Sequence, residues 1–203
     1  MELSPTSYAL LGLLSLRRWT TYELAQQAQR SLRFLYPRAE RILYAEAKRL
    51  AEAGLARSEA TFTGKRRSTN YAITPAGRKA LQAWLRTEPA PPVLEAEVLL
   101  RSFFGEFGRQ EDLLAALETT RTQAIEVQRE LAAMAEERLG GGAPFIERVG
   151  VVVLSMRFVT DFQRLLEEWA EWAAGEVATW EHPDGRDWKG ARTVMVDIAK
   201  GAR

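Results

Sequence analysis

Three consecutive cations, Lys65, Arg66 and Arg67, follow Gly64 at the middle of an expected β-hairpin. Ammonium and guanidinium groups bind phosphate oxygens, and arginine also enters narrow minor grooves. One charge would be enough to keep a soluble turn from pairing with another sheet edge. We therefore interpret the three cations as a contact to phosphates or to a minor groove.

A second set of polar side chains recurs at helical spacing just before this hairpin. Arg38, Arg41 and Lys48 fall on one stripe, with Tyr44 at its flank. An arginine can donate two hydrogen bonds to guanine in a major groove, while lysine and tyrosine often contact phosphate. Taken alone, the stripe is also compatible with an ordinary solvated helix face, but inside a winged-helix order a contact to DNA is favoured. Tyr44 is equally compatible with a packing role.

Aromatic residues form a third set near the C-terminus. Their spacing places most of them on one face of a long helix; the set consists of Phe158, Phe162, Trp169, Trp172 and Trp180. One interpretation is a dimer core, because Trp and Phe bury a large area with few rotamers to freeze. The other is an aromatic cavity that binds a flat effector, and both can hold together.

The sequence argues against catalysis and against a metal centre. It has no cysteine, and its only histidine, His182, stands near Asp184 and Asp187 on a Pro-Gly loop. Residues 140–142 are glycines, but no Lys-Ser/Thr pair follows them, so they lack the pattern of a phosphate-binding loop. We expect no enzyme activity, no cofactor and no metal.

The elements that must position the cationic sets can be located from caps and periodicity. Ser4 and Pro5 begin a buried helix over residues 4–17, and Thr20 or Thr21 caps a second helix over about 22–31. A third helix spans about 38–53 and ends at Gly54. Alternating strands on either side of residues 64–67 and a helix over about 75–86, capped by Thr74, complete a winged helix-turn-helix.

The proline-rich segment 88–92 marks a boundary between two domains. Residues 1–88 are predicted to form the winged helix-turn-helix, and residues 93–203 an all-helical dimerisation domain. We expect helices over about 93–107, 109–139, 145–180 and 192–199. The predicted fold class is mainly α with a small β-hairpin wing.

The charge is divided in the same way as the predicted domains. Residues 1–90 carry 15 Lys+Arg and 7 Asp+Glu, whereas residues 91–203 carry 13 Lys+Arg and 20 Asp+Glu. The basic half suits a phosphate-bearing partner, and the acidic half would be repelled by it.

The apolar run Tyr8–Leu16 is shorter than the roughly 20 residues of a membrane span. We expect a cytoplasmic protein that has no membrane partner.

Residues 6–85 resemble the PadR family of bacterial transcription regulators. The resemblance rests on residues 8–14, 21–24, 43–44, 48–50, 54–55, 65–67 and 71–74, and on Gly77. The C-terminal half is similar to the helical domain of the longer PadR-like proteins, in which a tryptophan-rich final helix supports dimerisation.

The resemblance implies a homodimer that binds double-stranded DNA, and the family pattern favours a repressor. Two-fold symmetry would match a near-palindromic operator, and a small aromatic effector would release the complex. The DNA-binding residues would be Arg38, Arg41, Tyr44, Lys48, Lys65, Arg66 and Arg67. Two alternatives stay open: a ligand sensor, and a winged helix that binds an acidic protein instead of specific DNA.

Overall fold

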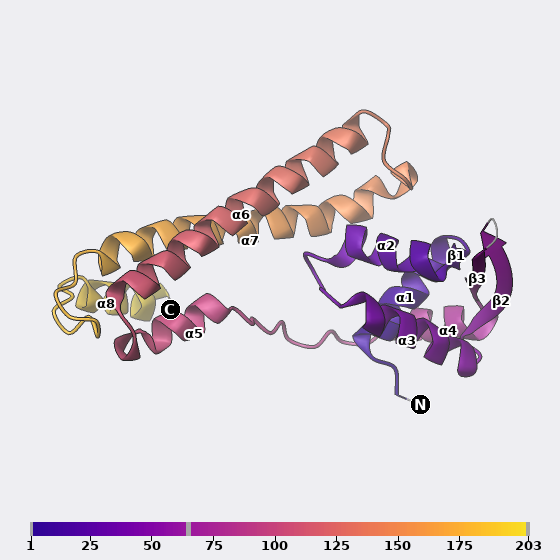
Figure 1. Ribbon diagram of the computed structural model, residues 1–203, viewed down its shortest axis with the longest axis horizontal. Helices are drawn as coiled ribbons and strands as arrows, with labels where there is room; N and C mark the ends of the chain where they lie inside the picture. Colours follow the sequence, from indigo (N-terminus) through magenta and orange to yellow (C-terminus); the bar gives the residue numbers. More distant parts are fainter. Residues whose placement is uncertain (1, 64–65, 202–203) are drawn as a thin grey trace. The chain divides into compact units, whose positions relative to one another are not determined.

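The computed structural model describes residues 2–63 and 66–201, except for the side chains of Thr63, Arg66 and Arg67. The chain separates into two compact units, Met1–Pro92 and Val93–Arg203. Figure 1 shows the elements of each unit. In the described part of the chain, no helix combines the length and the apolar character that a membrane crossing requires.

Unit 1 contains four helices and three strands. In chain order they are α1 (Pro5–Leu16), β1 (Trp19–Thr20), α2 (Thr21–Leu32), α3 (Glu40–Glu52), β2 (Ala56–Thr63), β3 (Arg66–Ile73) and α4 (Pro75–Trp84). The caps are those expected from the sequence: Ser4, Thr20 and Thr74 each accept a hydrogen bond from a backbone N–H in the first turn. Gly54 follows α3 with a φ of 71°, a conformation that glycine adopts without strain.

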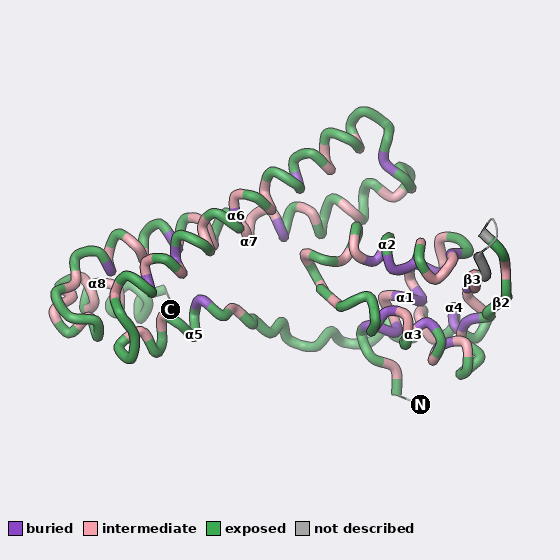
Figure 2. The backbone as a smooth tube through the Cα atoms, in the orientation of Figure 1, coloured by how far each residue is buried: buried purple, intermediate pink, exposed green. Residues whose placement is uncertain are grey.

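The core of unit 1 is made by aliphatic side chains from the three N-terminal helices. Leu10, Leu11 and Leu14 of α1 are at most 2% exposed, and they are joined by Leu24 of α2 and Leu50 of α3. Figure 2 shows buried stretches of α1, α2 and α3 in purple. Because α1 lies at the centre of this core, it fixes the orientation of α2 and α3.

The sheet has one strand that the sequence did not predict. Its strand order is β1-β3-β2, and both pairings are antiparallel. The short β1 is held by Trp19, which lies opposite Tyr71 and whose indole N–H donates to the carbonyl oxygen of Leu13 at 2.8 Å. The wing is therefore attached to the helices through the segment that joins α1 to α2.

Unit 2 is built around two long helices. It contains α5 (Glu97–Phe103), the 3-10 turn η1 (Gly105–Phe107), α6 (Gln110–Leu139), the 3-10 turn η2 (Ile146–Arg148), α7 (Val149–Val177) and α8 (Ala191–Gly201). The helices α6 and α7 run side by side (Figure 1). At one end of this pair, Val98, Leu113, Leu117 and Val177 form a buried cluster.

The predicted fold class, mainly α with a small β wing and an all-helical second half, is confirmed. Several boundaries were wrong. The helix predicted over 93–107 extends only over Glu97–Phe103 and is followed by the 3-10 turn Gly105–Phe107. Phe145 has a φ of 57°, so the last long helix starts after it, and Trp180 lies beyond that helix's end at Val177.

Candidate nucleic-acid interface

The outward face of α3 carries two of the predicted cations. Leu43, Ala47 and Leu50 are buried on the opposite face, which turns Arg41 and Lys48 to solvent. Lys48 Nζ lies 3.6 Å from a carboxylate oxygen of Glu52, an exposed pair of the kind that contributes little stability. Both cations are therefore available to an outside partner at little cost.

Tyr44 lies at the flank of this face, as predicted, and it is half-buried. Its hydroxyl donates to Glu40 Oε2 at 3.0 Å. Burial, followed by this hydrogen bond to Glu40 and the charge of Glu40, raises the pKa of the Tyr44 phenol. The phenol therefore stays protonated at neutral pH and remains a hydrogen-bond donor.

The sequence reasoning missed two polar neighbours on α2. Tyr22 is 62% exposed in the first turn of α2 and also contributes to the raised pKa of Tyr44. Gln26 Nε2 donates to the Tyr22 hydroxyl at 2.7 Å. The nearness of Tyr22 to Tyr44 depends on how α2 packs, so no pattern in the sequence indicated it.

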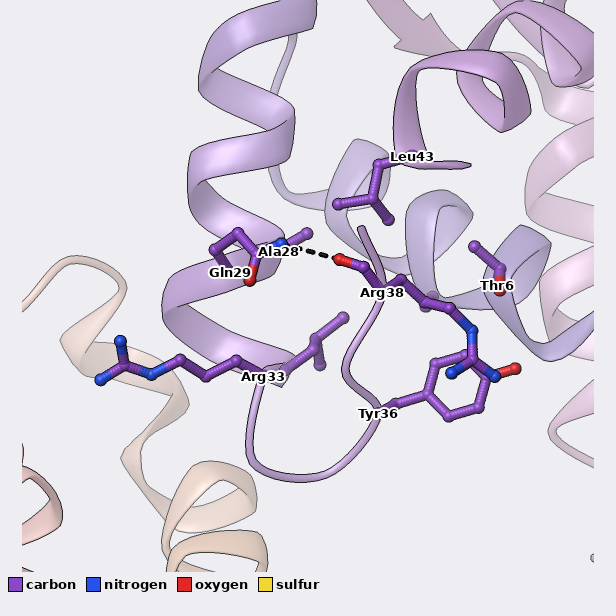
Figure 3. A pocket seen from close by; sticks show the side chains of 9 residues that line it. Thr6, Ala28, Gln29, Arg33, Tyr36, Arg38 and Leu43 are labelled. Carbon is purple, nitrogen blue, oxygen red and sulfur yellow. Dashed lines mark hydrogen bonds between the residues drawn. The ribbon is translucent and has the colours of Figure 1, made fainter. Parts of the chain in front are cut away.

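The prediction that Arg38 shares the face of α3 was wrong. Arg38 precedes the helix, its guanidinium stacks 3.7 Å from the ring centre of Tyr36, and its carbonyl oxygen accepts from Gln29 Nε2 at 2.7 Å (Figure 3). The hollow lined by these residues has a volume of about 10 Å³, which is room for about one water molecule. Arg38 thus secures the α2–α3 connection.

The wing holds the remaining predicted cations. Lys65 lies outside the described residues, as do the side chains of Arg66 and Arg67. The backbone register next to the tip places Thr63 opposite Arg66 and Phe62 opposite Arg67. The Phe62 side chain is 71% exposed, so an aromatic ring accompanies the basic tip.

A polar cluster clamps α3 to α1. The Arg49 guanidinium donates to both carboxylate oxygens of Glu46, at 2.6 and 2.8 Å, and to Ser7 Oγ at 2.8 Å. Ser7 is fully buried and also donates to Glu46. These hydrogen bonds, led by those from Arg49, lower the pKa of the Glu46 carboxyl. The clamp holds α3 in the position from which Arg41 and Lys48 project.

The aromatic residues predicted to bind an effector fall into separate groups in unit 2. Phe158 and Phe162 stack in parallel with ring centres 6.5 Å apart. Trp169 packs against the buried cluster around Leu117. The ring centres of Trp172 and Trp188 lie 6.2 Å apart. The side chains share one face of α7, but they do not converge on a single point.

The face of α7 that carries these aromatic rings also carries exposed apolar side chains at intervals of seven residues. Val151, Phe158, Leu165 and Trp172 are 58%, 68%, 59% and 43% exposed. A seven-residue apolar repeat is the pattern of a helix that packs against another helix.

The loop around His182 is arranged by hydrogen bonds. Arg186 binds Asp184 and lowers the pKa of its carboxyl to about 2. Asp187 accepts a hydrogen bond from the backbone N–H of Glu181. Within residues 2–63 and 66–201, no group of three His, Cys, Asp or Glu side chains is placed to hold a metal ion.

Comparison with known proteins gives a consistent set of relatives. No family model matches the chain. Over 99 residues, 48% of this chain, the sequence is 28% identical to the negative transcriptional regulator PadR of Bacillus subtilis, and the match spans only 54% of that protein. The chain therefore spans about half the length of the curated relative it matches.

Solved structures share the fold over most of the chain. The B. subtilis PadR structure in complex with operator DNA has a TM-score of 0.69 at 20% identity, covering 84% of this chain and 98% of PadR. The same protein in complex with p-coumaric acid has a TM-score of 0.64 at 18% identity, with coverages of 87% and 99%. The protein smu.1604c of Streptococcus mutans has a TM-score of 0.73 at 20% identity, with coverages of 85% and 99%.

Proposed function

We propose that this chain is a PadR-like transcriptional regulator; its 28% identity to PadR over 99 residues and the fold that it shares with PadR and smu.1604c support the proposal. The function is that of a sequence-specific DNA-binding regulator. The observation that carries the proposal is the outward face of α3, where Arg41 and Lys48 project beside Tyr44. In a winged helix, such a helix enters the major groove while the wing contacts the flanking backbone.

Each polar group on this surface has a distinct role in the proposal. Arg41 reads a base edge, because its guanidinium is exposed and no described carboxylate lies within ion-pair distance of it. Lys48 and Tyr44 contact phosphates, joined by Tyr22 from α2. The cations of the wing, Lys65, Arg66 and Arg67, neutralise further phosphates.

The active form in this proposal is a homodimer assembled through α7. The exposed repeat Val151, Phe158, Leu165 and Trp172 would become buried against the same helix of a second copy. A two-fold dimer presents two α3 helices to half-sites roughly one helical turn apart, so the operator should be close to a palindrome. Repression is supported by the B. subtilis relative, which is a negative regulator.

The proposal also includes a small aromatic effector that releases the protein from its operator. The exposed rings of Phe158 and Trp172 lie on the α7 face that the second copy would cover, and Phe162 stacks on Phe158. Trp169, on the same helix, would report on occupancy. The p-coumaric acid complex of PadR supports an aromatic acid as ligand class. Such a ligand acts only if it binds two dimer conformations unequally.

The decisive experiment is selection of bound fragments from random duplex DNA by the full chain. A shared motif with two-fold symmetry would support the proposal and give the half-site spacing. Recovery of unrelated fragments would contradict it and favour a protein-binding winged helix. A ligand sensor without specific DNA binding would instead show tryptophan quenching by aromatic acids together with a failed selection.

A further inference from the structure

A groove on unit 1 is lined by four arginines that the proposed interface does not use. Its volume is about 360 Å³, which lies within the size range of small-molecule sites. The lining comes from the end of α1, the base of the sheet and the start of α4, and it comprises Leu14, Ser15, Leu16, Arg17, Arg18, Arg57, Ala72, Ile73, Thr74, Pro75 and Arg78.

The strand register explains why two of these guanidiniums meet there. Arg57 lies opposite Ala72, and side chains alternate between the faces of a strand. Because its neighbour Ala56 is buried against the helices, Arg57 projects from the outer face of the sheet. Glu59 shares that face and binds both Arg57, at 2.9 Å, and Arg18, at 3.7 Å. The small side chain of Ala72 leaves the space between the two arginines open.

The groove has more positive charge than its own carboxylates neutralise. Arg57 and Arg18 share the single carboxylate of Glu59, and Arg17 pairs with Glu23 at 3.2 Å. Arg78 has no described carboxylate within ion-pair distance. Four cations thus face two carboxylates, so the groove attracts an anion.

Guanidinium groups and apolar walls together define the ligand. The Thr74 hydroxyl is already engaged, because it accepts from Gly77 N and donates to the Gly54 carbonyl. The guanidiniums therefore supply the free donors, and their planar fork matches phosphate oxygens in a bidentate manner. Leu14, Ile73 and Pro75 offer apolar surface to the body of the same ligand.

The geometry points to a binding site for a small organic phosphate, a phosphate group attached to an apolar body. The phosphate lies between Arg57 and Arg78, and the body lies along Ile73 and Pro75. None of the lining residues belongs to α2 or α3, and Arg57 and Ala72 pair at the base of the wing, away from the residues at its tip. The ligand would connect the base of the wing to the first turn of α4.

Titration calorimetry of the full chain with phenyl phosphate tests this site. Wild-type protein should bind phenyl phosphate more tightly than inorganic phosphate, which lacks the apolar body. The variants Arg57→Gln and Arg78→Gln should each bind it roughly tenfold more weakly. Arg101→Gln is the matched control, because Arg101 is an exposed arginine of α5 that pairs with Glu97. The affinity of this variant for phenyl phosphate should equal that of the wild type.

Three results would overturn the assignment. The first is no binding of phenyl phosphate at millimolar concentration, and the second is equal affinity in the groove variants and the wild type. The third concerns DNA: if duplex DNA displaces phenyl phosphate and both groove variants lose DNA affinity, the groove contacts the nucleic acid backbone instead. The binding of phenyl phosphate is measured without DNA, so its failure is distinguishable from failure of the proposed regulator function.

Discussion

Gly77 in the first turn of α4 lies against the carbonyl oxygen of Leu55, so closely that a methyl group at residue 77 would overlap that oxygen. The same carbonyl accepts a hydrogen bond from the backbone N–H of Thr74 at 3.1 Å. The start of α4 is therefore docked on the segment that joins α3 to the wing.

Replacing Gly77 with alanine should destabilise unit 1 by about 1–3 kcal/mol, because a backbone oxygen cannot move aside as a side chain would. The added carbon would also lie 3.0 Å from Cγ1 of Ile73 and 3.1 Å from Cδ2 of Leu11. Urea unfolding monitored by circular dichroism measures the change. Gly12→Ala is the control: nothing lies within 4 Å of a methyl group there, so its stability should stay equal or rise by up to about 1 kcal/mol.

The clamp between α1 and α3 predicts a pH dependence of stability. The folded-state pKa of Glu46 is lowered, chiefly by hydrogen bonds from Arg49. Its contribution is therefore present above the unfolded pKa and is lost as pH falls through the folded one. Glu46→Gln should cost about 1–3 kcal/mol at pH 7, and its difference from wild type should shrink in acid.

Unfolding curves at pH 7 and at pH 3 test this prediction. Glu52→Gln provides the comparison, because Glu52 pairs with Lys48 at an exposed site and should change stability by less than about 1 kcal/mol. A constant difference between wild type and Glu46→Gln across the acid range would contradict the role given to the clamp.

Arg41→Ala should reduce affinity for the selected operator by about 1–3 kcal/mol and relax preference at one base pair. Lys48→Ala should instead weaken binding to all sequences and flatten the salt dependence. Fluorescence anisotropy with operator and scrambled duplexes separates the two effects. An equal loss on both duplexes for Arg41→Ala would mean that this residue binds phosphate instead of a base.

The wing makes a separate prediction. The double variant Arg66→Ala, Arg67→Ala should lower affinity for every duplex, and the logarithmic slope of affinity against salt should fall by roughly 0.9 for each phosphate that the variant no longer neutralises. Binding measured from low to high salt gives the slope. If the slope stays as in wild type, the wing does not neutralise phosphates.

The exposed repeat on α7 predicts the assembly state. Leu165→Glu should convert a dimer into a monomer, because a carboxylate would have to be buried in the contact. Val153→Glu is the matched control: Val153 is 51% exposed on the same helix but does not belong to the seven-residue repeat. Light scattering after size-exclusion chromatography gives the mass of the wild type and of each variant. A dimer that persists in Leu165→Glu would place the contact elsewhere.

The elements of unit 1 could be predicted because their signals are local. Ser4, Thr20 and Thr74 cap their helices through hydrogen bonds three residues away, and Gly54 ends α3 by its positive φ. Each of these signals lies within one turn of the position it fixes. The strand β1 could not be found in this way, because its two residues have no period and form a strand only by pairing with β3.

The candidate site was predictable only as far as α3 itself. The burial of Leu43, Ala47 and Leu50 follows from helical spacing, and the exposure of the opposite face follows with it. The position of Arg38 depends on its stacking with Tyr36, and the nearness of Tyr22 to Tyr44 depends on how α2 packs. Such tertiary contacts leave no periodic trace in one sequence.

The rings of Tyr8 and Trp84 stack at 4.7 Å with planes 7° apart, which joins the start of α1 to the end of α4. The chain therefore enters and leaves unit 1, the helical and winged module, at neighbouring points. A module whose two ends meet can be cut out, rejoined by a short peptide and opened at another loop, or grafted as one piece onto a different scaffold. The helix α3, which we propose reads a groove, would be transferred with it intact.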